Sequence, residues 1–108
     1  MKHMCPCCGF QGLRAPAYER LTSNVLIRGA SPPYSAVWGM PSYEVCCCCG
    51  FEFGNDDEPG TSEPISFEQS LAQWKQNGEQ WFDVKKRSPG WTLTEQLSKA
   101  ERNQATPD

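Results

Sequence analysis

The chain has 108 residues and a formal net charge of −3, a size that fits one small domain. Acidic residues outnumber basic ones by 13 to 10, which argues against broad binding to the phosphate backbone of nucleic acids. No stretch reaches the roughly 18 apolar residues of a membrane helix, and no apolar signal-peptide core is present. We therefore expect a cytoplasmic protein with no membrane partner.

Near its beginning the chain reads Cys-Pro-Cys-Cys-Gly-Phe over residues 5–10, and a similar hexapeptide, Cys-Cys-Cys-Cys-Gly-Phe, recurs over residues 46–51. All seven cysteines lie in these two segments. Each segment contains Cys-x-x-Cys-Gly, the sequence of a zinc knuckle, and its glycine can adopt the positive φ that closes the turn. In a reducing compartment such clusters indicate metal or redox sites, because disulfides are rare there.

Residues 11–45 form a long insert between the two knuckles. Its segments Tyr18–Ile27 and Tyr34–Trp38 have the composition of β-strands, and the turn-forming residues 28–33 lie between them. Pro41 prevents an uninterrupted central strand. Residues 43–45 and 51–53 are then predicted as short strands that enter and leave the second knuckle, as in a zinc ribbon.

Residues 44–70 contain seven acidic residues and no lysine or arginine, and residues 54–64 of this stretch read as a turn-rich linker. After it, Ser66 and Gln69 form a capping box that predicts a helix over Phe67–Asn77. Thr92 and Glu95 form a second capping box, which predicts a short helix to about Arg102. The fold class that follows is α+β, with an antiparallel zinc-ribbon-like half (residues 1–58) and two C-terminal helices in a second half (residues 59–108).

A closed tetrahedral site requires four thiolates, and the glycine after the second cysteine of each knuckle selects them. The predicted metal ligands are Cys5, Cys8, Cys46 and Cys49. Cys7, Cys47 and Cys48 are then spare thiols, with roles left open. We expect one Zn²⁺ per chain, with iron as the alternative because rubredoxins also use two such knuckles. Buried unligated cysteines, disulfides, two separate sites or a ligand swap onto His3 are the remaining alternatives.

The two knuckles, together with residues 43–57 and the later Trp74, Trp81-Phe82 and Gly90-Trp91, resemble the small bacterial cysteine-rich CPCC proteins. The resemblance covers most of the chain but is weak over residues 11–42. It implies a zinc-ribbon-like metal site and no established activity. Some relatives lie near bacterial toxin systems, which implies an immunity or interaction role.

Three functions compete for this chain. The first is a metal-stabilised, non-enzymatic protein-interaction module, with an unidentified protein partner at the acidic loop 54–63 or at Trp81, Phe82 and Trp91, which are either core or interface residues. The second is a thiol or dithiol redox protein that uses the spare cysteines. The third is a nucleic-acid-binding zinc ribbon, for which the run Lys85-Lys86-Arg87 is the sole basic cluster. No pair of side chains predicts an acid–base catalyst, so we expect no enzyme.

Overall fold

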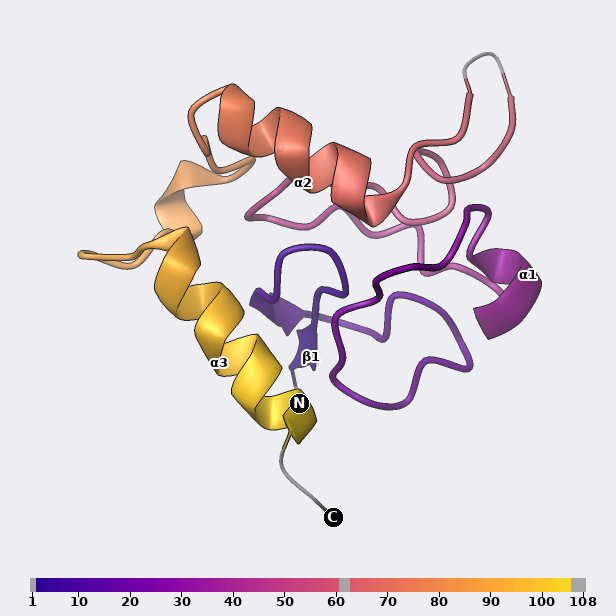
Figure 1. Cartoon of the computed structure of the whole chain (residues 1–108), viewed down its shortest axis with the longest axis horizontal. Helices are drawn as coiled ribbons and strands as arrows, with labels where there is room; N and C mark the ends of the chain where they lie inside the picture. Colours follow the sequence, from indigo (N-terminus) through magenta and orange to yellow (C-terminus); the bar gives the residue numbers. More distant parts are fainter. Residues whose placement is uncertain (1, 61–62, 106–108) are drawn as a thin grey trace.

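The computed structural model describes residues 2–60 and 63–105, and the side chains of these residues up to Arg102. A two-stranded antiparallel hairpin and three α-helices make up a small α+β fold, which confirms the predicted fold class in this coarse form. The elements are β1 (His3–Met4), β2 (Gln11–Leu13), α1 (Ser35–Trp38), α2 (Phe67–Gln76), the short 3₁₀-helix η1 (Val84–Lys86) and α3 (Leu93–Ala105). Helices α2 and α3 lie on two sides of the hairpin, and α1 lies at the opposite edge of the molecule (Figure 1).

The hairpin encloses the first knuckle, residues 5–10. Its strands pair His3 with Leu13 and Met4 with Gln11, with an irregularity in register between the two pairs. Around the second knuckle, residues 46–51, the strands predicted for 43–45 and 51–53 reduce to one antiparallel bridge between Val45 and Glu52. The more regular β-structure therefore surrounds the knuckle for which no strands were predicted.

The two strands predicted in the insert are wrong. Ser35–Trp38 instead forms helix α1, with Tyr34 as the residue that caps its N-terminus. In Tyr18–Ile27, the strand pairing is a single antiparallel bridge from Tyr18 to Pro41. Pro41 has no backbone N–H to donate, so the ladder does not extend evenly through it. Tyr18, Ile27 and Tyr34 are buried, and side chains that suit a buried site are the same ones that favour a strand. Composition alone therefore does not separate burial from strand formation.

The two C-terminal helices were predicted well. Helix α2 begins at Phe67 with the complete capping box, in which the Ser66 side chain accepts from the Gln69 backbone N–H and the Gln69 side chain accepts in return. It ends at Gln76, one residue before the predicted end. Before α3, the Thr92 hydroxyl accepts from the Glu95 backbone N–H at 3.2 Å, and the helix runs three residues beyond the predicted Arg102.

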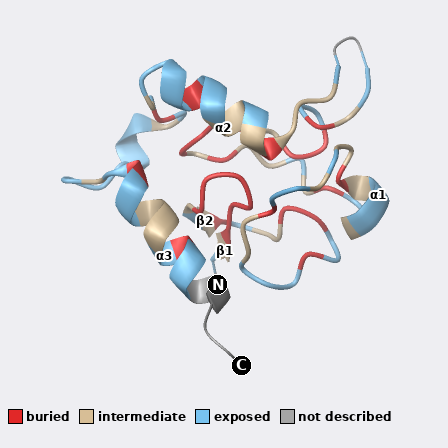
Figure 2. Cartoon of the chain, in the orientation of Figure 1, coloured by how far each residue is buried: buried red, intermediate tan, exposed pale blue. Residues whose placement is uncertain are grey.

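An aromatic cluster next to the cysteines fills the interior. Its members are Tyr18, Tyr34, Phe51, Phe53 and Phe67, all buried. The ring of Phe67, the first residue of α2, stacks on that of Tyr34 with centroids 4.1 Å apart, and lies 4.7 Å from that of Phe51. Most buried residues lie in the loops at the centre, while the helices are exposed along much of their surface (Figure 2). None of the helices in the described part of the chain is long and apolar enough to cross a membrane.

Candidate metal centre

Four cysteine sulfurs meet at the centre of the molecule. The Sγ atoms of Cys5, Cys8, Cys46 and Cys49 all lie within 4.8 Å of one another. Across the two knuckles, Cys5 and Cys49 have sulfurs 4.0 Å apart, and Cys8 and Cys46 have sulfurs 3.8 Å apart. Tetrahedral zinc with Zn–S bonds of about 2.3 Å places its sulfurs about 3.8 Å apart. The structure thus brings together the four cysteines selected from the sequence, in a spacing that fits one metal ion.

The first knuckle owes its shape to a tight backbone turn. The Cys5 N–H donates to the Phe10 carbonyl at 2.8 Å, and the Gly9 N–H donates back to the Cys5 carbonyl at 2.9 Å. Gly9 has a φ of 86°, a conformation that side chains with a Cβ rarely adopt. The turn therefore aims both cysteines of the motif in one direction.

The second knuckle forms the same turn with equivalent hydrogen bonds. The Cys46 N–H donates to the Phe51 carbonyl at 3.0 Å, the Gly50 N–H donates to the Cys46 carbonyl at 2.9 Å, and Gly50 has a φ of 79°. The same local sequence thus produces the same local geometry in both halves of the site.

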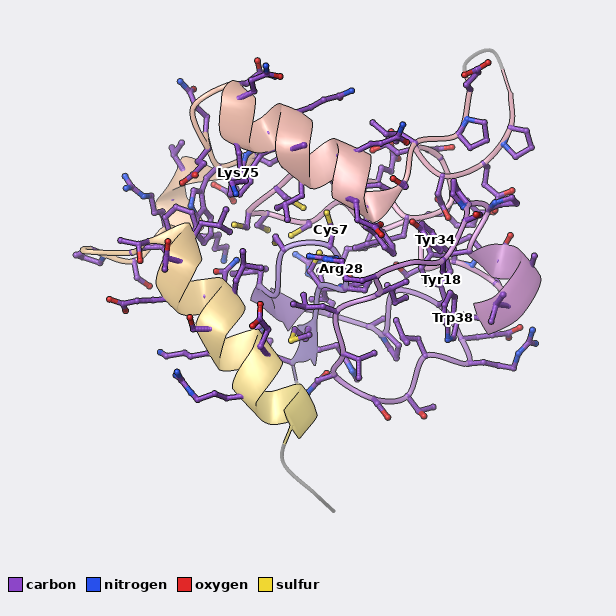
Figure 3. All side chains as sticks on the ribbon, viewed as in Figure 1. Cys7, Tyr18, Arg28, Tyr34, Trp38 and Lys75 are labelled. Carbon is purple, nitrogen blue, oxygen red and sulfur yellow. The ribbon has the colours of Figure 1, made fainter. Side chains whose placement is uncertain are left out.

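A side chain from the insert supports the first knuckle. The Arg28 guanidinium donates to the Pro6 carbonyl at 3.2 Å and to the Cys7 carbonyl at 2.7 Å. The backbone N–H of Ile27 also donates to the Pro6 carbonyl, at 3.0 Å. Figure 3 places Arg28 beside Cys7 at the centre of the molecule. No sequence signal pointed to Arg28, because its partners in the knuckle are backbone carbonyls more than 20 residues away.

Backbone groups support the second knuckle at the equivalent positions. The Asp83 N–H donates to the Cys47 carbonyl at 2.9 Å, and the Phe82 N–H donates to the Cys48 carbonyl at 3.2 Å. A chain segment that follows α2 thus docks on this knuckle without using its side chains for the contact.

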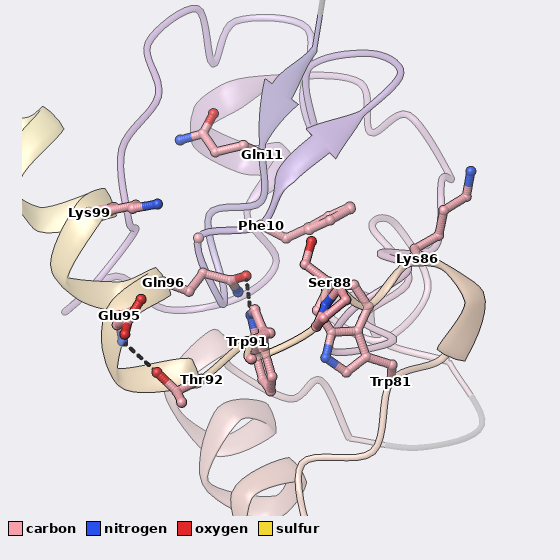
Figure 4. Close-up of a pocket in the computed structure, with 13 residues that line it drawn as sticks. Phe10, Gln11, Trp81, Lys86, Ser88, Trp91, Thr92, Glu95, Gln96 and Lys99 are labelled. Carbon is pink, nitrogen blue, oxygen red and sulfur yellow. Dashed lines mark hydrogen bonds between the residues drawn. The ribbon is translucent and has the colours of Figure 1, made fainter.

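Gln96 on α3 connects the centre to the C-terminal half. Its Nε2 donates to the Cys8 carbonyl at 2.9 Å and lies 3.6 Å from the Cys48 sulfur. Its Oε1 accepts from the Trp91 indole N–H at 2.8 Å, one of the dashed contacts in Figure 4. Gln96 was not among the predicted site residues, since a glutamine in a polar helix carries no signal of its own.

Burial and mutual hydrogen bonds alter the acidity of these thiols. Burial is the main cause that raises the pKa of Cys8 and of Cys46, whereas the hydrogen bond with Cys49 is the main cause for Cys7. At Cys49 the hydrogen bond with Cys46 raises the pKa, but those with Cys5, Cys7 and Cys8 outweigh it, so the pKa falls below its ordinary value. Burial disfavours the charged form of a thiol, so a bound cation would be what allows four thiolates to lie this close together.

The three spare cysteines lie outside this group of four. Cys7 is buried and its thiol donates to the Phe67 carbonyl at 3.4 Å, while Cys48 is buried beside Gln96. Cys47 is half-buried, and burial is the first cause that raises its pKa. His3, the alternative ligand, lies in β1 and does not join the four sulfurs.

The aromatic residues of the C-terminal half divide between core and surface. Trp81 is buried, Trp91 is half-buried, and Phe82 is 66 % exposed. Trp81 makes edge-to-face contacts with Phe10 at 5.4 Å and with Trp91 at 5.1 Å. These three rings line a groove of about 410 Å³ (Figure 4). Trp81 thus packs against Phe10 of the first knuckle and Trp91 packs against Trp81, whereas Phe82 is the largely exposed one of the three predicted candidates.

Comparison with other proteins adds no assignment. A scan against models of protein families finds no match, and searches of curated proteins and of solved structures find none. The resemblance to the CPCC proteins accordingly stays a prediction. What defines the class of this protein is its buried group of four cysteines in a small α+β fold.

Proposed function

We propose that this chain is a structural zinc-binding protein that acts as a protein-interaction module. The observation that carries the metal part is the group of four cysteine sulfurs within 4.8 Å of one another. Cys5, Cys8, Cys46 and Cys49 would hold one Zn²⁺, whose charge stabilises the four thiolates and ties two distant parts of the chain together.

A site with four protein ligands leaves no position for water or substrate, which supports a structural role over catalysis. The non-enzymatic interaction role is supported by the exposed apolar and acidic side chains described below. An immunity-like partner rests on the resemblance alone.

Iron is the alternative metal, since a tetrathiolate site also fits a rubredoxin-like electron-transfer protein. The redox alternative has weaker support, because the pKa of Cys7 and that of Cys47 are both raised, which lowers the thiolate fraction. For nucleic-acid binding, the run 85–87 offers three cations, one of which, Arg87, lies 5.5 Å over the Trp91 ring.

The test is the metal content of the untagged protein purified under reducing conditions. We expect about one zinc per chain and no visible absorption, because Zn²⁺ has a filled d shell. Cys5→Ser should lose the metal and the fold, and Cys47→Ser, at a spare position of the other knuckle, is the matched control that should retain both. Red colour with bound iron would replace the proposal by electron transfer. A folded Cys5→Ser protein without metal would overturn it.

A further inference from the structure

A groove at the edge of the molecule near α1 exposes large apolar side chains. It measures about 570 Å³, and its lining includes Glu19, Met40, Pro41, Tyr43, Gly54 and Glu58. Met40 is 63 % exposed and Tyr43 is 56 % exposed, and Val37 on α1 is 57 % exposed. Met40 and Tyr43 line the groove itself, and burying their exposed apolar side chains against a partner would be favourable. We call this the Met40–Tyr43 groove.

Backbone pairing holds the groove in one shape. The Glu19 N–H donates to the Met40 carbonyl at 2.9 Å, and the Ser42 N–H donates to the Ala17 carbonyl at 2.9 Å. The Glu19 carboxylate in turn accepts from the Met40 N–H at 3.1 Å. Since these bonds exist before any partner arrives, binding here would order little additional chain.

Tyr43 has an uncommon conformation for an exposed aromatic residue. Its φ is 62°, a region that bulky side chains rarely occupy. Its ring lies against Gly54, where a Cβ would come within 2.7 Å of the Tyr43 ring and 2.6 Å of Pro41. Strain of this kind persists where the surrounding structure enforces it, and it occurs often at binding sites.

Residues 54–58, at the start of the segment predicted as a linker, are anchored by Asp57 beside the groove. Asp57 is fully buried and accepts from the Tyr18 hydroxyl at 2.7 Å, from the Tyr34 N–H at 3.3 Å and from the Gly54 N–H at 2.8 Å. Burial, followed by this contact with Asp57, raises the pKa of Tyr18, so the phenol remains protonated and donates. The loop carboxylates next to Asp57 are therefore presented on a fixed backbone.

The groove continues into an acidic hollow of about 590 Å³, with which it shares Gly54 and Glu58. The acidic side chains of this hollow are Asp56, Glu58 and Glu63. Residues 29–74 of the sequence contain no lysine or arginine. Among the described residues that line the groove, Arg20 is the one cation, and it is engaged by Glu19 at 3.7 Å and by the Val37 carbonyl at 3.2 Å. The combined surface is apolar at one end and negatively charged at the other.

We propose that the Met40–Tyr43 groove and the acidic hollow together dock a positively charged protein surface. The partner places an apolar side chain against Met40 and Tyr43 and a lysine or arginine at Glu58 and its acidic neighbours. Opposite charges steer such a partner and fix its orientation, while the apolar contact supplies most of the affinity. This inference rests on the proposed interaction role, to which it adds a surface and a class of partner.

A second copy of the chain is the rival occupant. Exposed Phe82 and Val84 precede the basic run 85–87. This segment therefore combines apolar side chains with positive charge, which complements the apolar groove and its acidic hollow. Such a contact would join two different surfaces of the chain, and an open contact of that kind builds filaments unless it closes into a ring. A foreign partner needs no such closure, so we favour it, and the experiment separates the two.

The experiment selects from a random dodecapeptide library displayed on phage, with the full-length, metal-loaded protein as the target. Selected peptides should combine lysine or arginine with an aromatic or large aliphatic residue, and their affinity should fall as salt is added. Met40→Ser and Glu58→Gln should each weaken binding about tenfold, since central apolar contacts and paired charges dominate docking. Phe82→Ser, a matched change at another exposed apolar residue, should leave the affinity within about twofold.

Several results would overturn the inference. These are an absence of enriched peptides, enrichment of acidic or uncharged peptides, and binding that Met40→Ser does not alter. Peptides that resemble residues 82–87, with association of the chain by light scattering, would assign the groove to a second copy instead. Metal is measured on every variant, so a metal-bound protein that enriches no peptide contradicts the docking surface alone. A metal-free protein whose peptides depend on the groove contradicts the zinc proposal alone.

Discussion

The two knuckles have the same internal turn but very different surroundings. In both, a cysteine N–H and a glycine N–H close the loop with bonds of 2.8–3.0 Å. The first knuckle lies inside a paired hairpin, and α3 packs against its glycine, with Ala100 3.0 Å from a Cβ placed at Gly9. The second knuckle has one bridge beside it, and a Cβ at Gly50 would meet the Phe82 side chain at 3.6 Å.

This difference shows that the metal-binding turn depends on local sequence, whereas its surroundings depend on long-range packing. The turn and its two sulfurs depend on a few neighbouring residues, so they recur wherever the sequence recurs. The packing around each turn depends on segments far away in the chain, and these differ between the knuckles. Supports for the first knuckle include the Arg28 side chain, whereas the second is docked by backbone at Phe82 and Asp83.

The largest effect is expected when a cysteine ligand, the feature that the two knuckles share, is removed. Cys5→Ser and Cys46→Ser should abolish metal binding equally, because each deletes one of four equivalent thiolates, and the loss of apparent folding free energy is on the order of 10 kcal/mol. Circular dichroism with metal analysis measures both. If one variant alone lost the metal, the two knuckles would not form a single site.

Alanine substitutions at the two knuckle glycines should reveal the difference in packing around the knuckles. Alanine at either position costs about 1–2 kcal/mol for the positive φ. Gly9→Ala should cost about 1–3 kcal/mol more than Gly50→Ala, because its new Cβ would crowd Ala100 in α3. Urea denaturation of the metal-loaded variants measures the difference in free energy of unfolding. Equal losses of unfolding free energy in the two variants would show that α3 moves away from the new Cβ at little cost.

The two modes of support should differ in their response to side-chain truncation. Arg28→Met removes the donors to the Pro6 and Cys7 carbonyls and should destabilise the protein by about 1 kcal/mol. Phe82→Ala keeps the backbone N–H that bonds Cys48 and should cost no more than about 0.5 kcal/mol, as at other exposed positions. The same denaturation experiment compares them, and a larger loss for Phe82→Ala would reverse this interpretation.

The smallest effect concerns reactivity and leaves stability unchanged. Of the seven cysteines, all within the described residues, Cys47 is the half-buried one and the other six are buried. A maleimide should therefore label about one thiol per metal-loaded chain. Cys47→Ser should remove that label, and chelation under denaturing conditions should expose the rest. Rapid labelling of several thiols in the intact protein would contradict the buried centre.

The parts of the structure that sequence predicts are those with short-range causes. The four clustered cysteines follow from two Cys-x-x-Cys-Gly motifs, and helix α2 follows from its capping box. Helix α1 in the insert was predicted wrongly as a strand, because Tyr34–Trp38 has the composition of a strand. Its Tyr34 is buried against Phe67 of α2, a contact across 33 residues that no local pattern contains.

The sequence by itself therefore determined which cysteines can meet around one ion, since the turn chemistry of each knuckle is local. Tertiary structure decided that they do meet, and that Arg28 and Gln96 support them through backbone carbonyls. It also decided that Asp57 lies buried beneath an acidic surface, although its neighbours in sequence are exposed or half-buried. Burial and long-range hydrogen bonds depend on which segments pack together, and that is settled by the whole chain at once.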